Sequence, residues 1–377
     1  MKAPRAYYEA IATLTGCIIG AGILGIPYVL VRAGFWTGML VIIVLGLAML
    51  LVHLLIGEIS LRSTKCHQLV GYAEKYLGRP GKYFMAASMV IGIYGAMIAY
   101  TLGVSESLSA VFGGAQWFWA FAFYLLMSLL LYGGLQILEK SELLMETFKL
   151  SIFAIILAVL FSSRYFSAEK LVGFSWYNLL IPYGVVLFAY VGTAAIPEVR
   201  QEMNKCKLLT KRAIIIGSVI PIVAYALFAF AVVGVSGVNT SEVATIGLAF
   251  LVGGFGFILL HLFAVLAMAS SFVALGYALK DSYRFDFGIS HSWAWLLTLI
   301  VPALLLFAGV DSFVRTLEIA GIFAGGIAGI VIVLTHSKAK RMSDRKPEYS
   351  IKINWLGYGA LIALFSIGIL YGLFMLF

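Results

Sequence analysis

Three glycines near the amino terminus have the spacing of a loop that cradles phosphate. Gly20, Gly22 and Gly25 stand in the stretch GAGILG, which spells G-x-G-x-x-G. In a dinucleotide-binding domain such glycines follow a β-strand, open a helix and precede a carboxylate by about 20 residues. Here apolar stretches of helical length lie on both sides, and Leu45 stands where the carboxylate should be. The pattern therefore does not predict a nucleotide site, and the glycines need another explanation.

A second stretch repeats part of this pattern later in the chain. GILGIP at 22–27 and GTAAIP at 192–197 share the form G-x-x-x-I-P. In a membrane, small residues of this kind often let helices pack closely. Two matching motifs instead favour helices that break, with amides at the break attracting anions and carbonyls attracting cations. The paired motifs therefore predict a site for a zwitterion such as an amino acid, whose carboxylate can approach glycine backbone closely.

The elements that carry these glycines have the composition of membrane helices. Of the 377 residues, 62% are hydrophobic and only 11% are charged, and the mean hydropathy is +1.03. Soluble domains are about 45–50% apolar and about 25% charged, and a spanning helix needs about 20 apolar residues. The sequence predicts an all-α integral membrane protein with 11 transmembrane helices at 7–31, 34–60, 83–112, 116–137, 147–163, 178–198, 213–237, 248–279, 292–309, 312–336 and 354–377.

The two glycine motifs fall in the first and sixth predicted spans. Spans one to five and six to ten form two units of five helices, and because five is odd the second unit enters the membrane from the opposite side. This pattern indicates an inverted repeat whose broken helices meet near the bilayer midplane. We expect a single transmembrane domain over 1–377, with repeat one at about 7–163, repeat two at about 178–336 and an extra helix at about 354–377.

The basic residues are divided unequally between the two sides of the predicted bundle. The net charge is +9, and 22 of the 26 lysines and arginines fall on the side of the N-terminus. By the positive-inside rule, the N-terminus is cytoplasmic and the C-terminus lies outside the plasma membrane. The first apolar stretch has no small-residue cleavage site, so we expect no cleavable signal. The cysteines have no metal-ligand spacing, and we expect neither a disulfide nor a metal site. On the side opposite the N-terminus, the predicted loops contain only four basic residues, namely Arg32, Arg164, Lys170 and Arg315.

Several stretches resemble amino acid permeases of the amino acid–polyamine–organocation superfamily, especially the aromatic and hydroxy amino acid permeases and the amino acid/auxin permeases. The resemblance implies a leucine-transporter-like fold with discontinuous helices 1 and 6. It also implies a secondary active transporter that imports a neutral amino acid, aromatic ones among the candidates, by alternating access. The matching stretches are TGCIIGAGILGIPYVLVRAGF at 15–35, AYTLG at 99–103, ETFKLSIFAIIL at 146–157, FAYVGTAAIPEVRQEM at 188–203 and LAMASSFVALGYALKDSY at 266–283.

The resemblance implies a substrate site at the two breaks. The amides of Ala21 and Gly22 would receive the carboxylate of the substrate. Tyr100, in the third span, would offer its hydroxyl to the same carboxylate, or would simply pack within the bundle. Carbonyl groups of the sixth span would receive the ammonium group, and a threonine would shape the side-chain pocket. These sixth-span residues are Phe188, Ala189, Val191 and Thr193.

The resemblance also implies a coupling site between the first and eighth spans. In sodium-coupled relatives a cation would lie between the carbonyls of Gly16 and Ile19 and the hydroxyls of Ser270 and Ser271. In proton-coupled relatives a lysine of the fifth span occupies that place, and Lys149 matches it. An ammonium group there could replace the cation and carry the proton, which makes proton coupling the favoured alternative. The other possibility is that Lys149 reaches the cytoplasmic surface along its apolar stem.

Other classes of membrane protein fit the sequence less well. An enzyme would need a catalytic cluster at a membrane face, and His67, His291 and His336 form no recognisable set. His53 and His261 lie within spans, where packed histidines are expected. A channel would need a ring of like charges or a filter repeat, and neither is present. We therefore expect no enzyme and no cofactor besides a proton or sodium ion. The expected partners are an amino acid and the lipid bilayer, without nucleic acid, and the oligomeric state is left open.

Overall fold

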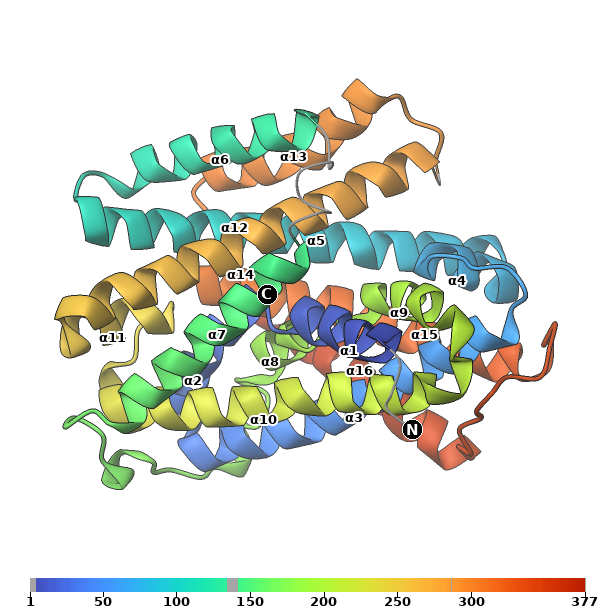
Figure 1. Cartoon of the computed structure of the whole chain (residues 1–377), viewed down its shortest axis with the longest axis horizontal. Coiled ribbons are helices and arrows are strands. Elements are labelled where there is room, and N and C mark those ends of the chain that lie inside the picture. Colours follow the sequence, from blue (N-terminus) through green and yellow to red (C-terminus); the bar gives the residue numbers. More distant parts are fainter. Residues whose placement is uncertain (1–4, 134–141, 286, 377) are drawn as a thin grey trace.

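The computed structural model describes residues 5–133, 142–285 and 287–376, which are helical and contain no β-strand (Figure 1). Most helices run along one common direction, as expected for a bundle that crosses a bilayer. The ends predicted at residues 1, 137 and 377 lie outside the described residues. The prediction of an all-α membrane fold is confirmed by this architecture.

Most of the predicted spans correspond to long helices. Among the described residues, seven helices are each long and apolar enough to cross a membrane, and the bent pair α1 (Arg5–Ile18) and α2 (Ile26–Ala33) forms an eighth span. The seven are α3 (Phe35–Arg62), α5 (Arg79–Phe112), α6 (Gln116–Gly133), α10 (Thr210–Ser236), α12 (Gly254–Phe285), the run from α14 (Phe313–Ala320) to α15 (Gly326–Ala339), and α16 (Trp355–Leu376). The other predicted spans correspond to α7 (Glu142–Phe161), the pair α8 (Tyr183–Ala189) and α9 (Ile196–Glu202), and α13 (His291–Phe307).

The predicted eighth span, 248–279, is divided in the structure. A short helix, α11 (Ala244–Val252), ends at Gly253, and α12 begins at the next residue. Gly253 and Gly254 have φ values of +63° and +49°, a conformation that residues with a Cβ rarely adopt. The spanning helix therefore starts six residues later than predicted and continues to Phe285.

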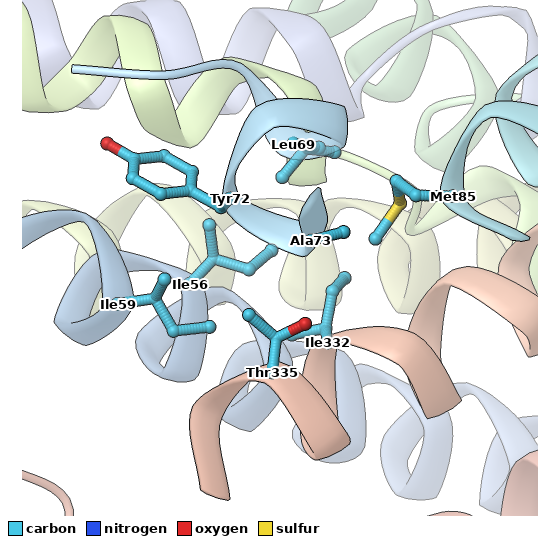
Figure 2. Close-up of a pocket in the computed structure, with 8 residues that line it drawn as sticks. All are labelled: Ile56, Ile59, Leu69, Tyr72, Ala73, Met85, Ile332 and Thr335. Atoms are coloured by element: carbon cyan, nitrogen blue, oxygen red, sulfur yellow. The ribbon is translucent and has the colours of Figure 1, made fainter. Parts of the chain in front are cut away.

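A short helix that was not predicted, α4 (Leu69–Leu77), lies across one end of the bundle. It is too short to span a bilayer, so hydropathy over long windows does not detect it. Figure 2 shows α4 above α3 and α15. The gap between these helices has a volume of about 10 Å³. A gap of this size holds at most about one water molecule, so it is a packing defect and not a ligand site. The residues around it are Ile56, Ile59, Leu69, Tyr72, Ala73, Met85, Ile332 and Thr335.

The connection between α15 and α16 is fixed to the same end of the bundle by a buried carboxylate. Glu58, fully buried near the end of α3, accepts hydrogen bonds from Arg62 at 2.7 Å, Ser350 at 2.8 Å and the amide of Ile351 at 2.6 Å. His336 Nε2 of α15 lies 3.1 Å from the same carboxylate. The end that carries α4, the start of α1 and this connection is called the basic end, and the opposite end is called the α11 end (Figure 1).

The two broken spans lie side by side and cross the bundle in opposite directions. In Figure 1, α1 and α2 run from the basic end to the α11 end, whereas α8 and α9 run the other way. The contacts agree, because α1 packs against α9 and α2 packs against α8. This antiparallel arrangement is the one expected of an inverted repeat.

Candidate functional site

The first span breaks at its glycine motif. Helix α1 ends at Ile18, Gly20 is extended, and Ala21–Gly25 form a 3₁₀ turn before α2. Pro27 stands in the first turn of α2, where a missing amide hydrogen breaks no helical bond. All five residues of the 3₁₀ turn are buried. The irregular backbone is thus enclosed by protein, as it must be at membrane depth.

The second break repeats the same order of elements. Helix α8 ends at Ala189, the backbone is irregular to Gly192, and a 3₁₀ turn over Thr193–Ala195 leads into α9. Pro197 again stands in the first turn of the following helix. The prediction that helices 1 and 6 are discontinuous is therefore confirmed.

The two breaks touch each other through their glycines. A Cβ added at Gly22 would lie 2.8 Å from Ala189 Cα and 3.2 Å from the Phe188 ring. A Cβ added at Gly192 would collide with the side chain of Ile18. Both contacts are closer than a side chain allows, so glycine is required at each position by the approach of the opposite break.

A cavity of about 520 Å³ extends from the two breaks to the basic end. Its volume lies in the range of about 300–1,000 Å³ that is usual for small-molecule sites. Cys17 on α1 and Ala194 and Glu198 beyond the second break are exposed in it. Beyond the breaks, towards the α11 end, Val185 and Leu317 are fully buried around Gly25. Within the described residues, the cavity is therefore open at the basic end and closed towards the α11 end.

The cavity brings together most of the predicted substrate residues. Ala21 does not line it and is fully buried next to Gly22. Tyr100 of α5 and Ser271 of α12 both line the cavity. The role of each residue stays a prediction, but a shared binding site requires that these residues line one cavity, and most of them do. The predicted substrate residues that line the cavity are Gly22, Tyr100, Phe188, Ala189, Val191 and Thr193.

The predicted coupling residues meet in the wall of the same cavity. Lys149 of α7 is 6% exposed, and its Nζ donates a hydrogen bond to Ser270 Oγ at 3.2 Å. Its ammonium group therefore lies inside the bundle and not at its surface. Gly16 and Ser271 also line the cavity, whereas Ile19 is buried behind it. The structure thus places a cationic side chain between the first and eighth spans.

One buried arginine at the basic end was not predicted as a structural residue. Arg200 of α9 is 5% exposed and donates to the Ser63 carbonyl at 2.6 Å and the Tyr72 hydroxyl at 3.1 Å. It therefore fixes the second half of the broken sixth span to the segment that leads into α4.

Burial, reinforced by the positive charges of Lys75 and Arg200, holds the pKa of His67 below its usual range.

Known proteins resemble this chain over nearly its whole length. "Glutamine transporter 2" from Aliivibrio fischeri is 24% identical and covers 96% of both chains. "Tyrosine-specific transport system 1" from Haemophilus influenzae is 25% identical over 95% of this chain and 93% of the relative.

Two solved structures share the fold. MhsT in complex with L-phenylalanine has a TM-score of 0.69 at 16% identity, covering 100% of this chain and 99% of MhsT. The inward-facing conformation of Mhp1 has a TM-score of 0.65 at 14% identity, covering 98% of this chain and 89% of Mhp1. The profile of the tryptophan/tyrosine permease family matches residues 5–375. The chain therefore belongs to the tryptophan/tyrosine permease family.

Proposed function

We propose that this protein is a proton-coupled secondary transporter that carries a neutral amino acid by alternating access. The observation that carries the proposal is the cavity of about 520 Å³, which reaches both helix breaks and contains Lys149. A transporter needs a site that opens to one side at a time, and this cavity opens to the basic end only, within the described residues. Relatives that are named glutamine and tyrosine transporters support an amino acid as the substrate.

The chemistry of the cavity fits a zwitterion with an uncharged side chain. Half-helix starts at the two breaks favour a carboxylate, and half-helix ends favour an ammonium group. Around the breaks, the wall consists of apolar and hydroxyl groups, such as Phe188, Val191 and Thr193. Among the described residues, the carboxylates that line the cavity are Glu9 in α1 and Glu198 and Glu202 in α9. The described residues of the two breaks that line the cavity carry no charged side chain, which favours a substrate side chain without charge there.

The distribution of charge supports an orientation and a direction of opening. The basic end carries most of the lysines and arginines, so we place it in the cytoplasm, with the C-terminus outside the plasma membrane. The structure then corresponds to the state in which the substrate site faces the cytoplasm. Lys149 would carry the coupling proton. The alternative is a sodium ion held by the hydroxyls of Ser270 and Ser271 together with the carbonyls of Gly16 and Ile19.

Counterflow in proteoliposomes tests the transport function and identifies the substrate. Vesicles loaded with unlabelled neutral amino acids would be diluted into labelled tryptophan, tyrosine, glutamine, leucine, serine or alanine. We expect transient accumulation of at least one label above its equilibrium level, because exchange needs only a reversible carrier. Protein-free vesicles give the background. Folded protein that exchanges none of these amino acids would contradict the proposal.

A further inference from the structure

One tyrosine outside the predicted site contacts both helix breaks. Tyr225 of α10 is fully buried, and its hydroxyl lies 2.5 Å from the carbonyl oxygen of Ile18 and 2.9 Å from that of Ala189. Ile18 is the last residue of α1, and Ala189 is the last residue of α8. A single side chain therefore reaches the carboxyl ends of both half-helices.

The carbonyl groups at both helix ends need a hydrogen-bond donor from outside their own helix. The last carbonyls of a helix have no partner in that helix and carry a partial negative charge. Here two such ends meet at membrane depth, where an unsatisfied polar group is costly. A tyrosine hydroxyl has one hydrogen to donate, so the two carbonyls share this donor, and the Ile18 carbonyl also accepts from the Gly20 amide at 2.8 Å. Neither end can move away without changing the hydrogen bond that the other receives.

The residues behind Tyr225 hold it in place. Its ring packs against the ring of Tyr190, with centroids 5.0 Å apart. Three residues before Ile18, the hydroxyl of Thr15 in α1 donates to the carbonyl of Gly217 in α10 at 3.3 Å. Helix α10 thus supports the first half of the broken span at two levels. Tyr225 is fixed by its surroundings and does not depend on a ligand for its position.

We propose that Tyr225 is a positioning residue that joins the two breaks into one preformed receptor for the substrate ammonium group. A carbonyl oxygen has two lone pairs, so Ala189 can accept from Tyr225 and still receive the ammonium group. Because Tyr225 holds both ends before the substrate arrives, binding does not need to order them, and preorganisation of this kind increases affinity. This inference rests on the proposed amino acid transport.

A matched pair of variants isolates the hydroxyl. Tyr225→Phe removes one oxygen that lies between two carbonyls. Tyr190→Phe removes the same atom from the neighbouring ring, whose hydroxyl is buried without a hydrogen-bond partner among the described residues. Tyr190 does not line the cavity. The measurements are the equilibrium Kd of the amino acid identified by counterflow and the melting temperature of each purified protein.

We expect Tyr225→Phe to weaken substrate binding about tenfold, because without the shared donor the two helix ends must be ordered when the substrate binds. Tyr190→Phe should change the Kd less than about twofold, because it breaks no hydrogen bond. A lower melting temperature of Tyr225→Phe with an unchanged Kd would reduce Tyr225 to a packing residue. Equal losses of affinity in both variants would assign the effect to ring packing. Either result overturns the proposal while leaving wild-type counterflow intact.

Hydrogen exchange of the wild-type protein tests the same inference without a substitution, should Tyr225→Phe not fold. The amides at 19–22 and at 190–193 flank the two carbonyls that Tyr225 contacts. If the two ends are joined, substrate should increase their protection together and at the same concentration. Protection gained at one break alone would contradict the proposal.

Discussion

Replacing Lys149 by alanine should abolish proton-driven accumulation of the substrate while leaving counterflow intact. The Lys149 ammonium group lies 3.2 Å from Ser270 Oγ, and the residue is almost completely buried in the wall of the cavity. With one proton per substrate, an inward gradient of two pH units supports about 100-fold accumulation, because each tenfold ratio corresponds to about 1.4 kcal/mol. In Lys149→Ala the ratio should fall to about one, since the loaded carrier still exchanges but gains nothing from the gradient.

Lys149→Arg separates the charge from the proton. Arginine keeps a positive charge but does not release its proton in proteins. We expect this variant to bind and exchange the substrate, although a wider side chain lowers the rate, and to lose proton-driven accumulation. Wild-type accumulation in either variant would contradict the role of Lys149. Accumulation driven by a sodium gradient instead would favour a cation at Ser270 and Ser271.

Adding one methyl group at Gly22 should nearly eliminate transport. The new Cβ of Gly22→Ala would lie 2.8 Å from Ala189 Cα and 3.0 Å from Ala189 Cβ. Backbone atoms cannot turn away, so the two breaks must separate at the place where the substrate carboxylate is proposed to bind. Overpacking of this kind costs about 1–3 kcal/mol. Because the substitution weakens substrate binding and also prevents the two breaks from packing closely, we expect a loss of about a hundredfold in transport rate at low substrate concentration.

Gly359→Ala is the matched control for this substitution. Gly359 lies in α16, and a Cβ added there has nothing within 4 Å. Alanine is favoured over glycine inside a helix by about 0.5–1 kcal/mol, so this variant should fold and transport like the wild type. Gly22→Ala protein with a wild-type Kd would contradict the placement of the carboxylate at the first break.

The sequence predicted those features that have local causes. Each break is marked by a glycine that tolerates close contact and by a proline that starts a helix. Both residues can be recognised in the sequence of each motif. The all-helical membrane class followed from composition, and the broken helices followed from the repeated motif. The leucine-transporter-like fold was implied only by the resemblance to amino acid permeases. The division at Gly253 and Gly254 was harder to place, because an apolar run of helical length continues on both sides of it.

The features that depend on contacts between distant residues were not predictable. Tyr225 meets Ile18 across 207 positions of the chain, and α10 is apolar all round, so no periodicity shows which face is turned inward. Arg200 stands among lysines and arginines that are exposed, and only the fold reveals that it is buried. Glu58 likewise is one carboxylate in an apolar helix, and its partners follow from the path of a connection nearly 300 residues later.

Labelling of Cys17 tests the central claim most directly, because this exposed residue of α1 lines the cavity next to the first break. With Cys66 and Cys206 replaced by serine, and counterflow shown to be retained, a membrane-impermeant thiol reagent would be applied to each side of the membrane. We expect labelling from the side of the basic end, slowed several-fold by a saturating concentration of the transported amino acid but not by a neutral amino acid that is not transported. A labelling rate that the transported amino acid does not change would contradict binding of the substrate at the helix breaks.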